Sequence, residues 1–306
     1  MHCLVLGGQG FLGTHIVEAL LAAGVEVSIL DRQLNRFQPP SPRAHLILSD
    51  WTQTAELEAA LRAVDVVIHL ISTTLPGNSN QQMQADVTGN LIATLNLLDL
   101  CLKQHVRRVV FASSGGTVYG QPQMLPIPET HPTEPLNSHG VVKLTIEKYL
   151  NLYHHLYGLE YVALRTSNPY GERQDPDRPQ GFVAVALGRI LRQEPIVIYG
   201  QGEVQRDYLY AADVAQAFVA AVCAPCAAQI YNVGSGSGLS LNDMLSNIFA
   251  VTGRTTEVQY TAPRLADVSA NVLDIAHIQH DLGWSPQTPL HIGLERTWQW
   301  FNALFA

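Results

Sequence analysis

The chain has 306 residues, of which 47% are hydrophobic and 14% charged, and its 26 acidic and 18 basic side chains give a formal charge of −8. This length allows two domains, or one large α/β domain with a smaller one, and excludes a small disulfide-stapled scaffold. A net acidic chain without a dense Lys/Arg run lacks the basic surface that nucleic acids and anionic membranes require, so neither is an expected partner.

The first residues and the cysteines are typical of a cytoplasmic protein. No positive region precedes the apolar run at 1–7, so no signal peptide is expected, and no apolar stretch approaches the roughly 18 residues of a membrane span. Four cysteines are too few to predict a disulfide framework, and the single C-x-x-C of Cys223 and Cys226 is not expected to bind metal. We therefore predict a cytoplasmic protein without a metal site.

The first half of the chain alternates short apolar strands with longer helical patterns. Strands are predicted at 2–6, 25–30, 64–70, 109–113 and 161–165, and helices at 11–23, 54–63, 87–105 and 141–157. Strands without polar alternation that are separated by helices form parallel sheets covered on both faces. The predicted fold class is therefore α/β, a Rossmann-type doubly wound parallel sheet.

Beyond Asn168 this alternation weakens, and Pro and Gly become frequent. We expect a first domain over 1–170, to which the chain returns near 209–236, and a smaller C-terminal substrate-binding domain over 171–306. The helices predicted at 87–105 and 141–157 are apolar over more than one stripe, so both must be buried on two sides. Packing between two subunits achieves this, so a homodimer is expected.

A glycine-rich segment, GGQGFLG over 7–13, joins the first predicted strand to the first predicted helix. Gly7, Gly10 and Gly13 allow a tight turn, close approach of a pyrophosphate and close packing of helix on strand. The helix N-terminus adds N–H donors for the phosphates. This context predicts a dinucleotide-binding first domain.

Acidic residues after the next two strands refine the prediction. Asp31, at the end of the second strand, accepts hydrogen bonds from ribose hydroxyls and repels a 2′-phosphate, which favours NAD over NADP. Arg32 beside it is the opposite signal, because an arginine can pair with such a phosphate. Asp50 and Trp51 are expected to contact adenine, Asp50 to cap the following helix, or both.

Several further segments carry a family resemblance. They are FASSGGTVYG at 111–120, Lys143, LRTSNPYGER at 164–173, IYGQG at 198–202, RDY at 206–208, YNVGSG at 231–236 and PRLAD at 263–267. With the glycine motif, the chain resembles the extended short-chain dehydrogenases over essentially its whole length. Within them it is similar to the NAD-dependent sugar-nucleotide epimerase/dehydratase family, and in particular to its UDP-glucose 4-epimerase-like members.

The resemblance implies a reaction and a set of site residues. Such epimerases use NAD to remove a hydride from C4 of the hexose in a UDP-sugar and to return it to the other face. A Tyr-x-x-x-Lys pair takes the C4 hydroxyl proton and holds the nicotinamide ribose, the latter through Lys143. Implied cofactor contacts are Phe11, Leu12, Leu70, Ser72 and Ser113. Implied substrate contacts are Asn168, Arg206 and Arg264 at the diphosphate and Asp267 at the uridine ribose, with sugar specificity near 182–187.

The chain departs from the family pattern at its reacting centre. His139 stands where the family has the tyrosine, so it is either a working imidazole base or a filler of a disabled site. Gly115 lacks the usual hydroxyl, which leaves Ser114 or Thr117 to supply it. Asp86 stands where relatives have Asn, either as an added charge or as a helix N-cap.

The same segments rank the reaction types. No acidic residue lies between Ser113 and Gly120, where the dehydratases of the family carry their acid and base. Epimerisation of UDP-glucose and UDP-galactose, or of the N-acetyl forms, is therefore the leading prediction. A catalytically impaired sugar-nucleotide-binding chain and a UDP-hexuronate epimerase or decarboxylase are the alternatives.

Overall fold

Seven parallel strands form the central sheet of the computed structural model, which describes residues 1–225, 228–263 and 268–305. In spatial order the sheet reads β10, β6, β5, β4, β1, β2 and β3, and all its pairings are parallel. The strands are β1 (His2–Leu6), β2 (Glu26–Asp31), β3 (His45–Leu48), β4 (Val66–His69), β5 (Arg108–Ser114), β6 (Glu160–Thr166) and β10 (Ala228–Val233). Apart from β10, this is the strand order of dinucleotide-binding sheets.

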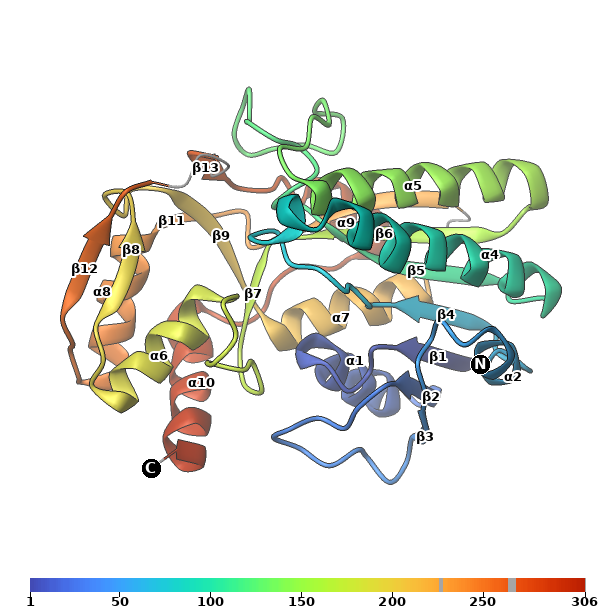
Figure 1. Cartoon of the computed structure of the whole chain (residues 1–306), viewed down its shortest axis with the longest axis horizontal. Coiled ribbons are helices and arrows are strands. Elements are labelled where there is room, and N and C mark those ends of the chain that lie inside the picture. Colours follow the sequence, from blue (N-terminus) through green and yellow to red (C-terminus); the bar gives the residue numbers. More distant parts are fainter. Residues whose placement is uncertain (226–227, 264–267, 306) are drawn as a thin grey trace.

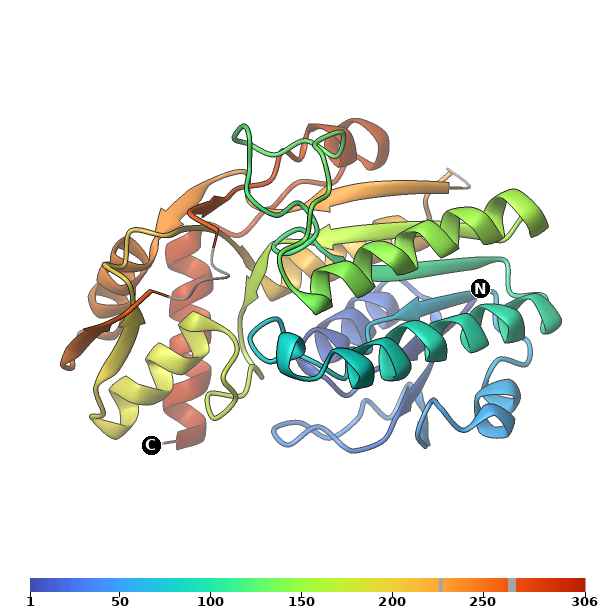
Figure 2. The same cartoon turned by 45° about the horizontal axis from the view of Figure 1, so that its top comes forward.

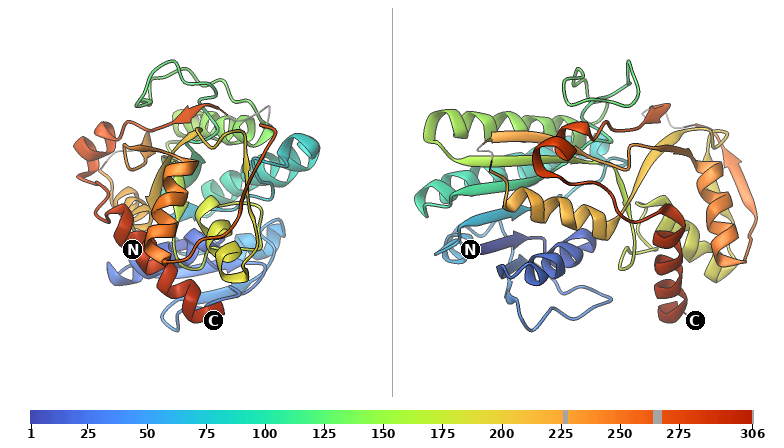
Figure 3. Two further views of the ribbon diagram at one scale, coloured as in Figure 1. Left: turned by 90° about the vertical axis from the view of Figure 1, so that its left-hand side faces the viewer. Right: turned by 180° about the vertical axis from the view of Figure 1, so that it is seen from behind.

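Helices cover both faces of this sheet. Figure 2 shows α4 (Ala93–Lys103) and α5 (Ser138–Tyr157) side by side on one face, where α2 (Thr54–Ala60) also packs. The right-hand view of Figure 3 shows α1 (Phe11–Ala22) and α7 (Ala211–Val222) on the opposite face, which α9 (Ala276–Leu282) completes. The central strands are therefore buried on both sides, which explains their unbroken apolar sequences. The predicted doubly wound fold is confirmed.

The helix expected at 87–105 begins earlier and is not uniform. Helical structure starts with the short α3 (Met83–Asp86), continues as a π-helical segment over Val87–Ile92, and ends as α4. This continuous run, Met83–Lys103, has 21 residues and contains an 18-residue window with a mean hydropathy of 1.2, so by length and composition alone it is long and apolar enough to cross a membrane. The expectation that no apolar stretch reaches that length is therefore wrong. Core helices of soluble proteins have the same properties, and α4 contributes to the core beneath α5.

A second group of elements, here the C-terminal cluster, lies beside the carboxyl ends of the sheet (Figure 1). Its helices are α6 (Phe182–Arg192), α8 (Leu241–Thr252) and α10 (Leu290–Phe305), which share one apolar core. Its strands are β7 (Asn168–Tyr170), β8 (Ile196–Tyr199), β9 (Gln205–Tyr210), β11 (Gly238–Ser240), β12 (Val258–Thr261) and β13 (Ala270–Asn271). The domain boundary at residue 170 stays a prediction.

The chain leaves the sheet after β6 and returns to it later. It first forms part of the C-terminal cluster, then adds α7 against α1 and finally β10 along the edge of β6. Phe218 of α7, Tyr231 of β10 and Trp284 after α9 all lie in the core that buries α1. The two parts are thus interleaved in sequence although they are separate in space.

Candidate functional site

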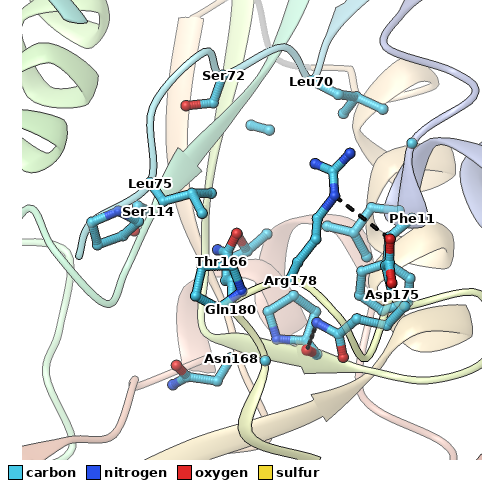
Figure 4. A pocket seen from close by; sticks show the side chains of 18 of the residues that line it. Phe11, Leu70, Ser72, Leu75, Ser114, Thr166, Asn168, Asp175, Arg178 and Gln180 are labelled. Carbon is cyan, nitrogen blue, oxygen red and sulfur yellow. Dashed lines mark hydrogen bonds and ion pairs between the residues drawn. The ribbon is translucent and has the colours of Figure 1, made fainter. Parts of the chain in front are cut away.

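A cavity of about 1150 Å³ opens at the carboxyl ends of the parallel strands, between the sheet and the C-terminal cluster. Figure 4 shows side chains around it from the start of α1 (Phe11), the end of β5 (Ser114) and β7 (Asn168). Small-ligand pockets typically measure about 300–1,000 Å³, so this one has room for a dinucleotide and a second ligand. The predicted residues that line it are Gly7, Gly10, Phe11, Leu12, Gly13, Asp31, Arg32, Asp50, Trp51, Leu70, Ser72, Ser113, Ser114, Thr117, His139, Lys143, Asn168 and Arg206.

The glycine turn between β1 and α1 is shaped to receive phosphates. Gly7 has a φ of +84°, a conformation that L side chains rarely adopt. A Cβ added to Gly13 would lie 2.2 Å from the Gly7 carbonyl oxygen and 2.7 Å from Gly8 Cα. No side chain caps α1 at Gly10, so its first N–H groups are left for a ligand. This cradle fits the pyrophosphate of a dinucleotide.

The end of β2 supplies the acidic residue of the site. Asp31 Oδ2 accepts a hydrogen bond from the Gln9 backbone N–H at 3.0 Å, which holds the carboxylate against the glycine turn. Burial raises the pKa of Asp31, and the backbone N–H groups around it oppose that shift. The carboxylate lines the cavity, where ribose hydroxyls can donate to it. Arg32 is exposed and lines the cavity beside it.

Asp50 and Trp51, the residues after β3, form a turn that precedes α2. Asp50 Oδ1 accepts hydrogen bonds from the Thr52 N–H at 2.9 Å and the Thr52 hydroxyl at 2.8 Å, whereas α2 begins after Gln53. The prediction that Asp50 caps this helix is therefore wrong, and its contact with adenine stays a prediction. Trp51 is buried against His69, with ring centroids 5.0 Å apart, and it also lines the cavity.

The end of β5 has no space for a side chain at position 115. A Cβ on Gly115 would lie 2.5 Å from a methyl carbon of Leu273, so the hydroxyl has to come from elsewhere. Ser114 and Thr117 both line the cavity, and the buried Thr117 hydroxyl has no hydrogen-bond partner in the described part of the chain. It is therefore available to a ligand. The Ser113 hydroxyl, in contrast, donates a hydrogen bond inside the core, so a cofactor contact there would use its backbone.

The start of α5 places the two residues expected at the reacting centre. Asn137 Oδ1 accepts a hydrogen bond from the Gly140 N–H at 2.8 Å, so the helix begins at Ser138 and not at the expected residue 141. His139 and Lys143 consequently lie one turn apart on the buried face of α5. Both line the cavity.

Burial sets the charge of this pair. Lys143 Nζ donates a hydrogen bond to the Ala112 carbonyl at 2.7 Å, and burial lowers its pKa to about 8 against the opposing effect of two carboxylates. Burial and then the Lys143 charge lower the pKa of His139 to about 4, with Asp86 opposing. His139 is therefore neutral at pH 7. It can accept a proton, but only as a weak base.

Asp86 lies next to this pair, and its predicted role as an N-cap is wrong. It is a fully buried residue inside the continuous helical run, where α3 passes into the π-helical segment. One carboxylate oxygen accepts hydrogen bonds from the Thr74 hydroxyl at 2.7 Å and from Asn90 Nδ2 at 2.8 Å. The other accepts one from the Ser138 hydroxyl at 2.7 Å. Asp86 thus connects the loop after β4 to the start of α5.

Two of the expected substrate residues meet at the other end of the cavity. Asn168 in β7 and Arg206 in β9 lie on strands that pair with each other. Asn168 Nδ2 donates to the Asp207 carbonyl at 3.1 Å, and Arg206 donates to two backbone carbonyls at 2.9 Å each. Ser167 and Tyr208 also line the cavity, and their buried hydroxyls have no hydrogen-bond partner among the described residues. These polar atoms suit a hydroxylated ligand.

Within the segment expected to set sugar specificity, four side chains of α6 line the cavity: Phe182, Val183, Val185 and Ala186. Arg264, Asp267 and Cys226 lie outside the described residues. Over 1–225, 228–263 and 268–305, no group of three or more His, Cys, Asp or Glu side chains is arranged to hold a metal ion.

The sequence did not predict the residues that connect the loops around the glycine-turn end of the cavity. Arg173, with a φ of +69°, donates to Glu18 at 2.8 Å and to Gln38 at 2.6 Å, and a third contact joins it to His15 at 2.9 Å. These bonds connect the loop after β7 with α1 and the loop after β2. Arg178, from the same loop as Arg173, points into the cavity (Figure 4). No local sequence signal links these positions.

Comparison with known proteins gives consistent matches over the whole chain. Residues 3–234 match the model of the NAD dependent epimerase/dehydratase family. The UDP-glucose 4-epimerase of Mycolicibacterium smegmatis is 33% identical over 310 residues, which cover 99% of each chain. The crystal structure of UDP-glucose 4-epimerase with UDP-glucose from Thermotoga maritima gives a TM-score of 0.94 at 32% identity, over 100% of both chains. The Thermus thermophilus UDP-glucose 4-epimerase in complex with NAD gives 0.90 at 34% identity, over 99% of both chains.

Proposed function

The chain belongs to the NAD-dependent epimerase/dehydratase family, and we propose that it inverts C4 of the hexose in a UDP-sugar through a transient 4-keto form. The observation that carries this proposal is the cavity itself. It brings His139 and Lys143 together with the glycine turn at one end and with Asn168 and Arg206 at the other. A cofactor and a sugar nucleotide therefore have room to meet at the start of α5.

Each group has a chemical task in this reaction. When bound, NAD accepts the C4 hydride and returns it to the opposite face of the sugar. The neutral His139 ring accepts the proton of the C4 hydroxyl, and the Thr117 hydroxyl is free to hydrogen-bond the same oxygen. Lys143 is a buried cation suited to ribose hydroxyls. Arg206 and Asn168 supply donors for the diphosphate.

The proposed substrates are UDP-glucose and UDP-galactose, followed by their N-acetyl forms. The similarity to UDP-glucose 4-epimerases over the full chain supports this choice. The alternative is epimerisation or decarboxylation of a UDP-hexuronate. A panel of these sugar nucleotides, each incubated with the NAD-loaded chain and analysed by chromatography, distinguishes them by which one yields a C4 epimer or loses CO₂.

A second candidate is a binding protein with impaired catalysis, because His139 is a weak base where the family has tyrosine. A general base contributes about 10²–10⁴-fold to rate, so its loss leaves a slow enzyme with an intact site. The deciding experiment measures conversion of UDP-galactose to UDP-glucose by the unmodified chain and by His139→Tyr side by side. Comparable rates show that His139 or a neighbouring residue is a working base. Turnover by the tyrosine variant alone identifies the chain as a binding protein.

We also propose a homodimer formed through the outer face of α4 and α5. This face carries apolar side chains that are 43–60% exposed, namely Ile92, Val141, Leu152, Leu156 and Tyr157. Large exposed apolar side chains on two neighbouring helices are typical of a subunit interface. Light scattering should give the mass of two chains for the unmodified protein and of one chain for Leu156→Glu. A monomer in both cases contradicts the proposal.

A further inference from the structure

We propose that the buried carboxylate of Asp86 is the counter-charge of the His139–Lys143 pair and acts as a positioning residue for proton transfer at His139. The reaction step in this inference rests on the function proposed above. The electrostatic role does not, because it concerns the resting protein. Figure 2 shows the segment that carries Asp86 running beside the first turn of α5.

The first support is the way in which Asp86 is held. The side chain is fully buried and accepts three hydrogen bonds, from the Thr74 hydroxyl, Asn90 Nδ2 and the Ser138 hydroxyl. Together these hydroxyl and amide donors occupy both oxygens of the carboxylate and fix its orientation. Ser138 directly precedes His139, so the carboxylate is fixed to the same helical turn as the imidazole. Asp86 is therefore both anchored and close to the pair.

The second support is the balance of charges around the pair. Besides the pair itself, three titratable groups are involved. Asp86 and Glu147 raise the pKa of Lys143, and Asp86 also raises that of His139. The Lys143 charge in turn lowers the pKa of His69. Glu147 is already matched, because it forms a buried ion pair with Arg165 at 2.7 Å. His69 is neutral, since burial lowers its pKa to about 3.

Of the two carboxylates that act on Lys143 within the described residues, Asp86 is therefore the one that balances its charge. It is also the group that favours protonation of both members of the pair. The Asp86 carboxylate therefore has an electrostatic role in addition to linking α3 and α5.

The third support is the chemistry that the site has to perform. When the C4 hydroxyl is oxidised, its O–H electron pair forms the carbonyl bond, the C4 hydride passes to the cofactor and the proton passes to a ring nitrogen of His139. The resulting imidazolium lies one turn from the Lys143 ammonium in a buried site. Two adjacent buried cations repel each other, and a nearby anion offsets that repulsion. The Asp86 carboxylate provides that anion, and the proton returns to the oxygen when the hydride is given back.

The resting protein gives the direct test. In protein labelled with ¹⁵N-lysine, the pKa of Lys143 is followed by NMR in the unmodified chain and in Asp86→Asn, which is nearly isosteric but uncharged. We expect the pKa to fall by about one to three units, as for loss of an opposite charge nearby. Ser138→Ala keeps the charge but removes one of its hydrogen bonds, and it should leave the pKa of Lys143 nearly unchanged.

Asp213→Asn, which neutralises another buried carboxylate in α7, is the second control and should also leave this pKa unchanged. An unchanged pKa in folded Asp86→Asn overturns the proposal, as does an equal fall in all three variants. If Asp86→Asn fails to fold, Asp86→Ser is titrated in its place, because it removes the same charge with a smaller side chain.

Activity gives a second test, because the effect of Asp86→Asn on kcat should have opposite signs with histidine and with tyrosine at position 139. With His139 present, Asp86→Asn should lower kcat by about tenfold or more with little change in KM, because a charged imidazolium forms during the reaction. In a His139→Tyr background the base becomes an anionic phenolate, so the same change should raise kcat.

A fall of similar size in both backgrounds shows a purely structural role and overturns the proposal. If no variant converts any sugar nucleotide, the proposed function has failed. The Lys143 titration then still decides the electrostatic role of Asp86.

Discussion

Replacing Gly13 by alanine tests whether the closeness of α1 to β1 creates the cofactor site. The added Cβ would lie 2.2 Å from the Gly7 carbonyl oxygen and 2.7 Å from Gly8 Cα, so α1 has to move away from the turn by about 1 Å. Overpacking of this kind costs about 1–3 kcal/mol, from which the better helix propensity of alanine recovers up to about 1 kcal/mol. The moved helix N-terminus no longer meets the phosphates, so the loss of NAD affinity should exceed the loss of stability.

The assay combines urea unfolding with calorimetric titration of NAD. We expect Gly13→Ala to unfold at lower urea and to bind NAD at least about tenfold more weakly, which corresponds to 1.4 kcal/mol. Gly253→Ala is the matched control. It lies at the end of α8 with a φ of +63° and nothing within 4 Å of its Cβ position, so it should cost stability through backbone strain alone and leave NAD binding unchanged. Unchanged NAD affinity in Gly13→Ala would refute the reasoning.

Three further predictions concern charge. Lys143 has a folded pKa of about 8, below its unfolded value of 10.5, so the native protein binds fewer protons between these values and its stability rises with pH there. Lys143→Met should lack this pH dependence, so the difference in unfolding free energy between the unmodified protein and the variant should change by about 3 kcal/mol between pH 8 and 10.5, measured by urea unfolding. A difference that stays constant over this pH range contradicts the prediction. Glu147→Gln leaves the buried Arg165 guanidinium without its ion-pair partner and should lower the free energy of unfolding by about 3–5 kcal/mol. A decrease below about 1 kcal/mol, as for a solvent-exposed salt bridge, contradicts the prediction. Asp31→Ser removes the charge that repels a 2′-phosphate, so the ratio of NADPH to NADH affinity, measured by fluorescence, should rise by at least about tenfold; an unchanged ratio would show that Asp31 does not face the ribose.

The central sheet is predictable because its strands carry the signal in their own sequences. β1 and β4 are apolar apart from one terminal histidine each, His2 and His69, as expected of parallel strands buried on both faces. The π-helical segment and the short strands of the C-terminal cluster have no such signal. β13, for instance, is only Ala270–Asn271, and it exists because it pairs with β9. Its conformation depends on tertiary contacts that no local pattern records.

The candidate site also contains residues that local sequence places and residues that only tertiary contacts place. The glycine turn and the two groups on α5 are set by neighbours in sequence, so their positions follow from motif and helical spacing. The environment of Asp86 is not local, because its partners Thr74 and Ser138 are 12 and 52 residues away. Asp86 was predicted as a helix cap, whereas in the fold it is a buried residue that links the loop after β4 to the start of α5. Burial and then the Lys143 charge lower the pKa of His139, with Asp86 opposing them, so its protonation could not be assigned from the sequence alone.

The late return of the chain to its sheet has a consequence for synthesis on the ribosome. A nascent chain of 170 residues would expose the open edge of β6, which β10 later covers, and the apolar face of α1, which Phe218 and Trp284 help to bury. Unpaired strand edges and uncovered apolar faces favour aggregation. The dinucleotide-binding half therefore cannot finish folding first and wait for its partner. It has to remain incomplete, or protected by a chaperone, until nearly the whole protein has emerged.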